Sequence, residues 1–273
     1  MKTVVLNSGY EMPVLGLGTW PLKGDECTEV VKTALQLGYR HIDTAADYEN
    51  HEDVGRALQE SDIERSDLFI TSKVSRGDLH YDDFLRATER ILAELAVDYL
   101  DLLLIHWPNK EIPMEETLEA MARLQKEGKV RSLGVSNFTE AHIRQAMRAF
   151  PDLISVNQVE FHPYLYQKEL LDFCREHHIV LTAYSPLAQG KIFRDDRIRV
   201  LTEKYGFSAA QLVLKWLLEK GIVVIPKASS PGHLKDNLDV LNLEIGPEVL
   251  AELDNMDENL RLILPSFHEF DLK

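Results

Sequence analysis

The sequence lacks most features that mark secreted or membrane proteins. It has only two cysteines, Cys27 and Cys174, which lie far apart in the chain and form no CxxC pair. A disulfide framework is therefore not expected, and a reducing compartment fits best. No apolar run approaches the roughly 18 residues of a membrane-spanning helix, and the opening residues contain no apolar segment typical of a signal peptide. We expect a cytoplasmic protein.

Positive charge is also scarce. The chain has 30 Lys and Arg residues against 45 Asp and Glu residues, which gives a formal net charge of −15. Such an acidic chain is repelled by nucleic acid and by anionic membrane surfaces, so neither is an expected partner. A local cationic pocket can still hold an anionic cofactor. We expect a monomer that binds small molecules.

The chain alternates between short apolar runs and segments with helical spacing. The eight runs are 14–20, 39–45, 67–73, 99–106, 130–137, 153–160, 179–185 and 222–229. Most of them are nearly all apolar, as is typical of parallel strands buried on both faces. The segments between them, such as 82–97 and 114–128, place charge on one face of a helix. Eight such repeats predict an α/β fold, a (β/α)8 TIM barrel that forms one domain over residues 1–273.

The two ends of the chain depart from this alternation. Residues 3–13 contain two short extended pieces, which predict a β-hairpin that closes the bottom of the barrel. Residues 260–273 show no periodicity and predict a loop near the barrel mouth. A Rossmann fold is not favoured, because Gly16 and Gly18 are followed by Pro21 where a GxGxxG motif needs glycine.

Polar residues follow successive apolar runs, at the end where the chemistry of a (β/α)8 barrel is located. Asp43 and Tyr48 follow the second run, Lys73 ends the third and His106 ends the fourth. Each alone has an ordinary explanation, as a packing tyrosine, half of a structural ion pair or a core histidine. Four such residues at adjacent strand ends instead predict one shared site.

These four side chains together suit a proton donor. A tyrosine has an ordinary pKa of about 10, and a nearby ammonium favours its anion. Lys73 would supply that charge while paired with Asp43, and His106 would hydrogen-bond the substrate oxygen. Such a site protonates an oxygen that gains negative charge, as a carbonyl does when it receives hydride. None of the four can donate hydride, so a cofactor is required.

A metal site is the alternative interpretation of the same segment. His41, Asp43, Asp47, His51 and His106 are all residue types that bind metals in barrel hydrolases. The sixth and eighth strand ends, however, add no further histidine or aspartate ligand. We therefore expect no metal.

The residues resemble the aldo-keto reductase family over nearly the whole chain. The matching segments, in the family's order, are GTWPLKGD, YRHIDTAADYEN, FITSKV, LDLLLIHWP, GKVRSLGVSNF, NQVEFHP, AYSPLAQGK and VVIPKAS. The length and the hairpin are similar to small prokaryotic members that reduce methylglyoxal or 2,5-diketo-D-gluconate. The resemblance implies metal-free, NAD(P)H-dependent reduction of aldehydes, 2-ketoaldehydes or keto sugars to alcohols.

The resemblance also implies roles for individual residues. Tyr48 is the expected general acid, Asp43 and Lys73 its tuning pair, and His106 the residue that orients the substrate. The expected cofactor contacts are Thr19, Trp20, Asp43, Ser136, Asn137, Gln158, Tyr184, Ser185, Leu187, Gly190, Lys227, Ser229, His233 and Asn237. Of these, Ser136, Asn137 and Gln158 would hold the nicotinamide carboxamide, and Tyr184 would stack on the nicotinamide ring. The expected substrate pocket is formed by Trp20, Tyr48, His106, Trp107 and the C-terminal loop.

The far end of the expected cofactor site departs from the family's NADP-preferring pattern of a lysine, a serine, an arginine and a Glu-Asn pair. Lys227 and Asn237 match, whereas Ala228, His233 and Asp236 replace the serine, arginine and glutamate. Arginine is always charged, but histidine is charged only below its pKa, ordinarily about 6.5. We expect NADPH as cofactor, with NADH also accepted. The preference for NADPH over NADH should narrow as the pH rises from about 6 to 8. If His233 points into solvent, Lys227 alone would bind the 2′-phosphate.

The polar residues directly after Tyr48 predict the start of a helix. Asn50 would cap it, and Glu52 and Asp53 would favour its positive end. These residues and His51, which stands where the family usually has glutamate, are then expected to serve capping and solvation.

Two functions from different classes fit this sequence. The first is a carbonyl reductase, and the second is a non-catalytic nicotinamide-binding barrel that acts as a sensor or regulatory module. The complete set of four strand-end residues favours the enzyme, because a module without chemistry has no physical need for all of them.

Overall fold

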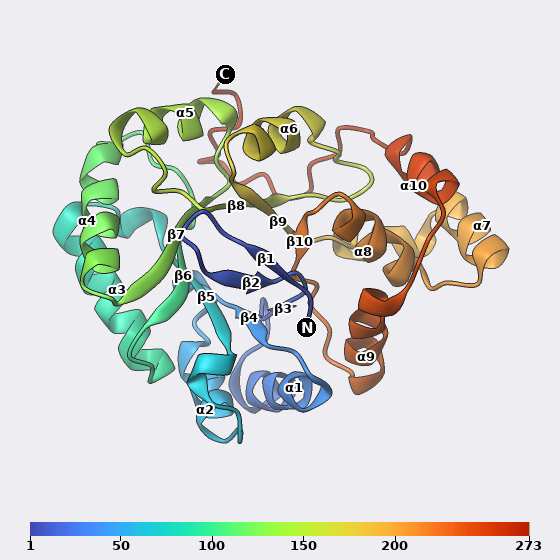
Figure 1. Ribbon diagram of the computed structural model, residues 1–273, viewed down its shortest axis with the longest axis horizontal. Helices are drawn as coiled ribbons and strands as arrows, with labels where there is room; N and C mark the ends of the chain where they lie inside the picture. Colours follow the sequence, from blue (N-terminus) through green and yellow to red (C-terminus); the bar gives the residue numbers. More distant parts are fainter. Residues whose placement is uncertain (273) are drawn as a thin grey trace.

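The computed structural model describes residues 1–272, which form a parallel β-barrel surrounded by helices (Figure 1). The strands, in sheet order, are β3 (Leu17–Gly18), β4 (His41–Asp43), β5 (Phe69–Val74), β6 (Leu100–Ile105), β7 (Val130–Ser136), β8 (Val156–Glu160), β9 (Val180–Tyr184) and β10 (Val223–Val224). The backbone of Gly16 donates a hydrogen bond to Val224 O at 2.9 Å, and Val224 N donates to Val14 O at 3.0 Å, which joins β10 to the chain before β3. Each of the eight predicted runs contains one strand, although β5 extends one residue beyond the end of its run, so the TIM-barrel prediction is confirmed.

Amphipathic helices form the outer layer of the barrel (Figure 1). They are α1 (Gly24–Leu37), α2 (His51–Gln59), α3 (Tyr81–Leu95), α4 (Met114–Lys126), α5 (Glu140–Ala149), α6 (Lys168–Glu176), α7 (Asp196–Tyr205), α8 (Ala209–Glu219), α9 (Pro231–Asp239) and α10 (Pro247–Asp254). In α3 the buried residues Phe84, Ala87, Ile91 and Leu95 recur every three or four positions, which places them on one face. No helix in residues 1–272 is long and apolar enough to cross a membrane.

A β-hairpin closes the barrel at the amino ends of the strands, as predicted. It consists of β1 (Thr3–Val5) and β2 (Glu11–Pro13), which pair antiparallel. Leu6 and Met12 of this hairpin are buried in a cluster with the interior barrel residues Leu102 and Val156. The hairpin therefore supplies part of the hydrophobic core and leaves the opposite end of the barrel open.

The chain after α10 forms neither helix nor strand in its described part, which ends at residue 272. Phe267 and Phe270 pack edge-on against Trp107, with ring centroids 5.5 and 5.7 Å away. Since Trp107 lies two residues beyond the carboxyl end of β6, this tail lies at the barrel mouth, where the sequence predicted a loop.

Candidate active site

A cavity of about 730 Å³ opens at the carboxyl ends of the strands. Of the residues predicted for the site, those that line it are Thr19, Trp20, Asp43, Tyr48, His106, Trp107, Ser136, Asn137, Gln158, Tyr184, Ser185, Leu187, Gly190 and Lys227. Lys73 is fully buried and reaches the hydroxyl of Tyr48 with its ammonium. Most of the predicted residues thus converge on one cavity, although they come from segments spread over more than 200 positions.

Asp43, Lys73 and Tyr48 form one continuous hydrogen-bonded chain. Lys73 on β5 donates to Asp43 Oδ1 at 2.6 Å, to Thr44 O at 2.8 Å and to the Tyr48 hydroxyl at 3.2 Å. All three donor positions of the ammonium are therefore used. The second oxygen of Asp43 accepts from Gln158 Nε2 at 2.6 Å. The chain holds the charge of the buried Lys73 side chain against the tyrosine oxygen on the cavity wall.

Burial and charge act in opposite directions on these groups. Burial raises the pKa of Tyr48 above its usual value, while the Lys73 ammonium pulls that pKa down. Burial by itself would lower the pKa of Lys73, but Asp43 and Tyr48 outweigh it and raise the pKa of the lysine. Lys73 therefore stays charged, and its field favours the tyrosinate form that a proton donor must leave behind.

Asp47 is a site residue that sequence reasoning considered only as a metal ligand. It belongs to the short 3-10 turn η1 (Ala46–Tyr48) and lines the cavity. Its Oδ2 lies 2.8 Å from Nδ1 of His106, and its Oδ1 accepts a hydrogen bond from Ser75 Oγ. The only sequence signal was its position next to Tyr48, because the direction of a side chain in a tight turn cannot be predicted from spacing.

The candidate metal ligands have other partners in the structure. Within residues 1–272, no three His, Cys, Asp or Glu side chains are grouped as a metal site requires. His41 is buried between Pro13 O, at 3.3 Å, and Thr71 Oγ1, at 3.1 Å. His51 lies between Ser72 Oγ at 2.8 Å and Glu94 at 2.9 Å.

Two details of the predicted helix start are wrong. Asn50 does precede α2, but its side chain makes no cap and instead accepts from Thr44 and donates to Thr19 and to Leu22 O. His51 is buried rather than solvated. The amide of Asn50 connects three segments around the site, and such a buried network satisfies more polar groups than a helix cap does.

Polar side chains form the floor of the cavity beside Asp43. Asn137, at the end of β7, donates to His106 O and to Ser136 Oγ, each at 3.1 Å, and accepts from the Tyr184 hydroxyl at 2.8 Å. Its backbone has a φ of 63°, a left-handed conformation that asparagine tolerates better than most residues. This floor presents amide and hydroxyl groups of the kind that bind a carboxamide.

Comparison with known proteins agrees with this geometry. Residues 14–258 match the model of the Aldo/keto reductase family. The chain belongs to this family. The glyoxal reductase of Bacillus subtilis (strain 168) is 43% identical over 261 residues, covering 95% of this chain and 94% of that protein. Methylglyoxal reductase DkgA of Escherichia coli (strain K12) is 39% identical over 265 residues, with coverage of 95% and 94%.

A solved structure shows the same fold as this aldo/keto reductase. It is MGS-M4, an aldo-keto reductase enzyme from a Medee basin deep-sea metagenome library, with a TM-score of 0.93 and 37% identity. The alignment covers 98% of this chain and 99% of that one. Carbonyl reduction with a nicotinamide cofactor is therefore the activity class of the protein, and no finding supports a non-catalytic barrel.

The loop after β9 borders the cavity through Leu187, Gln189 and Gly190. Ala188, Gln189 and Gly190 have φ values of 47°, 51° and 85°, so three successive residues adopt the left-handed region. The N–H groups of Ala188 and Gly190 donate within the loop, to Ser185 O and Leu187 O, each at 2.9 Å. The strain of two non-glycine residues in this region is typical of ligand-binding loops. A bound nicotinamide cofactor would supply the hydride that these side chains lack.

The predicted contacts at the far end of the cofactor lie outside the cavity wall, apart from Lys227. Ser229 and His233 are exposed, and Asn237 is buried. Helix α9 begins at Pro231, as predicted, and is capped by Ser230, which accepts from His233 N at 3.2 Å. This helix start lies four residues beyond Lys227, so its positive end and the lysine can both favour a phosphate.

Asp236, which stands where the family pattern has glutamate, faces away from this helix start. Its two oxygens accept from Ser208 Oγ at 2.8 Å and from Gln211 Nε2 at 2.7 Å. Both partners belong to the capping box at the start of α8. The carboxylate therefore ties α9 to α8.

Glu160, at the end of β8, anchors the C-terminal tail over the cavity. It is fully buried and accepts from the backbone of Leu262 at 2.7 Å and of Ile263 at 2.9 Å, and its Oε1 lies 2.9 Å from His162 Nε2. Ile263 lines the cavity. The carboxylate thus holds one wall of the substrate pocket in place, a function that sequence reasoning did not assign.

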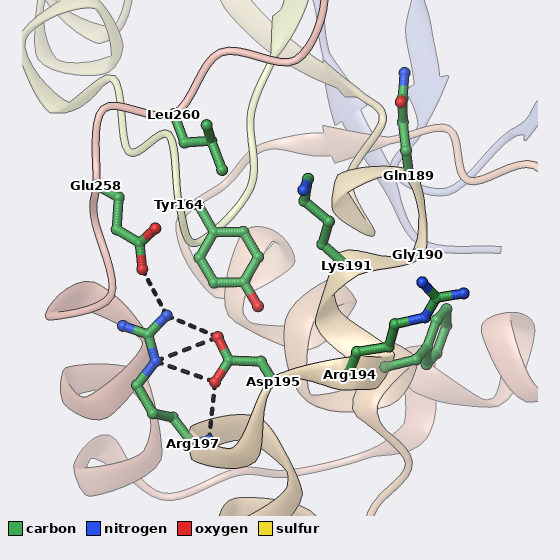
Figure 2. A pocket seen from close by; sticks show the side chains of 10 residues that line it. Tyr164, Gln189, Gly190, Lys191, Arg194, Asp195, Arg197, Glu258 and Leu260 are labelled. Carbon is green, nitrogen blue, oxygen red and sulfur yellow. Dashed lines mark hydrogen bonds and ion pairs between the residues drawn. The ribbon is translucent and has the colours of Figure 1, made fainter.

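A second cavity, of about 620 Å³, shares the lining residues Gln189 and Gly190 with the first (Figure 2). Arg197 pairs there with Asp195 and Glu258, each at 2.7 Å, while Tyr164 lines the same space. None of the four predicted catalytic residues lines this cavity. Reaction chemistry is therefore assigned to the first cavity.

Proposed function

We propose that the protein is an NADPH-dependent reductase of small aldehydes, 2-ketoaldehydes and keto sugars, with Tyr48 as general acid. The observation that carries this proposal is the contact between the buried Lys73 ammonium and the Tyr48 hydroxyl, at 3.2 Å on the cavity wall. An ammonium in that position favours loss of the tyrosine proton to an oxygen that gains charge. The two bacterial relatives, a glyoxal reductase and a methylglyoxal reductase, support small dicarbonyl substrates.

Each of the four residues has a distinct part in this proposal. Tyr48 gives its proton to the carbonyl oxygen, and Lys73 stabilises the resulting anion. Asp43 keeps Lys73 charged and oriented, which their 2.6 Å contact supports. His106, whose ring meets that of Tyr48 edge-on, binds and orients the substrate oxygen. Trp20 and Trp107 bound the space in which a small substrate fits.

The remaining cofactor roles follow from the cavity. Ser136, Asn137 and Gln158 would bind the carboxamide, Tyr184 would stack on the nicotinamide ring, and Lys227 would bind the 2′-phosphate. Gln158 also donates to Asp43 at 2.6 Å, so one amide would couple the cofactor site to the proton donor. We further propose that residues 1–273 act as one domain, as a monomer in the cytoplasm.

The choice between NADPH and NADH rests on His233. Its side chain is exposed in the first turn of α9, six positions beyond Lys227 in the sequence. A cation at this position would favour the 2′-phosphate of NADPH. In His233→Arg, which places a permanent charge there, the ratio of kcat/KM for NADPH over NADH should therefore be larger than in the wild type.

The first experiment is the oxidation of NADPH and then NADH, followed by absorbance, with methylglyoxal as substrate. Loss of absorbance that depends on enzyme and substrate supports the reductase. The same assay with aldehydes and keto sugars ranks the substrate classes. If NADPH binds tightly but no carbonyl compound is reduced, the proposed function is wrong. A ratio of kcat/KM for the two cofactors that is unchanged in His233→Arg contradicts only the role of His233.

A further inference from the structure

The carboxylate of Asp47 is fixed on both sides at the edge of the reaction cavity. One oxygen lies 2.8 Å from Nδ1 of His106, and the other accepts a hydrogen bond from Ser75 Oγ. The two atoms are close, but they are not aligned as a hydrogen bond. Among residues 1–272, Nδ1 therefore has no hydrogen-bond partner. In this structure the Asp47 carboxylate therefore acts on His106 through its charge. Hydrogen bonds in active sites are often poorly aligned without substrate and become aligned when substrate binds.

The orientation of the His106 ring decides what it can offer a substrate. Nδ1 is buried beside Asp47, while the ring lines the cavity, so Nε2 is the nitrogen left for a ligand. The ring also meets Tyr48 edge-on, with centroids 5.7 Å apart. A neutral imidazole has one N–H, and a carboxylate beside Nδ1 favours the proton on that nitrogen. In that form Nε2 only accepts hydrogen bonds, whereas the doubly protonated ring donates from both nitrogens.

Charged groups from three elements face this ring. Lys73 of β5 disfavours its protonation, while Asp47 of η1 and Asp43 of β4 favour it. The largest influence is burial, which lowers the pKa of His106 below its usual value. Asp47 is the strongest of the groups that act against burial. His106 in turn is the largest cause of a lowered pKa at Asp47, so the two groups stabilise each other's charged form.

We propose that Asp47 is a positioning residue for carbonyl reduction, because its carboxylate keeps a proton on Nδ1 of His106. With Nδ1 protonated, Nε2 can donate a hydrogen bond only when the ring is doubly protonated. This inference rests on the proposed function. The proton that completes the alcohol still comes from Tyr48, and His106 lends only a hydrogen bond to the substrate oxygen. The value of kcat/KM for reduction should therefore be highest at low pH. The Asp47 carboxylate should raise the pH up to which kcat/KM stays high.

The sign of the expected change follows from the charge of Asp47. The carboxylate favours the protonated ring, so its removal shifts the titration of His106 to lower pH. The pH at which kcat/KM falls to half should then shift in the same direction. A purely structural role for Asp47 predicts something else, namely a loss of the same size at every pH.

The test is the pH profile of kcat/KM for methylglyoxal reduction by the wild-type enzyme and by Asp47→Ala. We expect the midpoint to fall by about half a pH unit or more in the variant. Asp47→Asn, which keeps the shape of the side chain, should shift it in the same direction and serves if Asp47→Ala folds poorly. The control is Glu52→Ala, which removes a negative charge from an exposed residue in the first turn of α2. An unchanged midpoint in both Asp47 variants, or an equal shift in the control, overturns the proposal.

Nitrogen NMR of the His106 ring provides a readout that does not need turnover. The ring should titrate at lower pH in Asp47→Asn than in the wild type, and its neutral form should carry the proton on Nδ1 in the wild type. A neutral wild-type ring protonated on Nε2 overturns the proposal even if activity changes. Failure of the wild-type enzyme to reduce any carbonyl compound instead overturns the proposed function, while the titration still reports whether Asp47 and His106 are coupled.

Discussion

The ammonium of Lys73 lies 3.2 Å from the hydroxyl oxygen of Tyr48, and it is held there by Asp43 at 2.6 Å. Lys73 is fully buried, so its charge is not weakened by water and acts on the tyrosine at short range. Removing the aspartate would leave that charge uncompensated. The proton donor of the proposed reaction is therefore a unit of three residues whose parts have separable effects.

Replacement of Tyr48 by Phe removes the proton but keeps the ring on the cavity wall. We expect kcat for methylglyoxal reduction to fall by about 10²- to 10⁴-fold, the usual contribution of a general acid. The affinity for NADPH, measured by quenching of protein fluorescence, should change little because the hydroxyl contacts Lys73 and not the floor of the cavity. Turnover within a few-fold of the wild type would remove Tyr48 from the mechanism.

Replacement of Lys73 by Met leaves the buried carboxylate of Asp43 without its ion-pair partner. The free energy of unfolding should fall by about 3 to 5 kcal/mol, because the remaining charge is paired with no cation. Asp43→Asn combined with Lys73→Met removes both charges and should recover most of that loss without recovering activity. Urea unfolding of the two single variants and the double variant measures this coupling. Additive losses of stability would show that the pair does not act as a unit.

The barrel and the four strand-end residues could be predicted from the sequence, because their signals are local or periodic. Each apolar run marks one buried strand, and the polar residue that ends it faces the mouth of a parallel barrel. Even β3 and β10, which have two residues each, lie inside the predicted runs. The contact of Asp236 was not predicted at the far end of the expected cofactor site. Its side chain on α9 accepts a hydrogen bond from Ser208, at the start of α8.

The remaining site residues could not be predicted, because their roles depend on contacts between distant segments. Asp47 meets His106 across 59 positions of sequence, and Glu160 meets Ile263 across 103. Asn50 was expected to cap a helix, as its residue type favours, but a buried network of three segments uses its amide instead. Residue type and spacing predict which local hydrogen bond a polar side chain favours. They do not predict a contact with a distant segment that takes the place of that local bond.

Replacement of Glu160 by Gln should loosen the tail that covers the substrate pocket. The carboxylate accepts two hydrogen bonds, from the backbone N–H groups of Leu262 and Ile263. In glutamine an NH2 group replaces one of the two oxygens, so a donor would face one of these N–H donors. We expect KM for methylglyoxal to rise by about tenfold, corresponding to the loss of one charged hydrogen bond, with a smaller change in kcat. Glu258→Gln is the control, because that residue is exposed and pairs with Arg197. An unchanged KM with faster proteolysis of the tail would show that the tail does not shape the pocket.

His41 predicts how stability depends on acid. It is fully buried between Pro13 and Thr71, and burial lowers its pKa from 6.5 to about 4. The unfolded chain therefore takes up this proton first as the pH falls. The stabilising contribution is complete above about pH 6.5 and is lost as the pH falls toward 4, with a total of about 3 kcal/mol.

The test compares the pH dependence of unfolding in the wild type and in His41→Gln, which cannot titrate. Between pH 7 and pH 4.5 the wild type should lose about 2 to 3 kcal/mol more than the variant in urea unfolding, although the variant is less stable at pH 7. Other buried histidines, such as His51 and His142, also have lowered pKa values and contribute equally to both proteins. His233→Gln, at an exposed position, should follow the wild type. Parallel curves for the wild type and His41→Gln would mean that His41 is already protonated in the folded protein or that water reaches it.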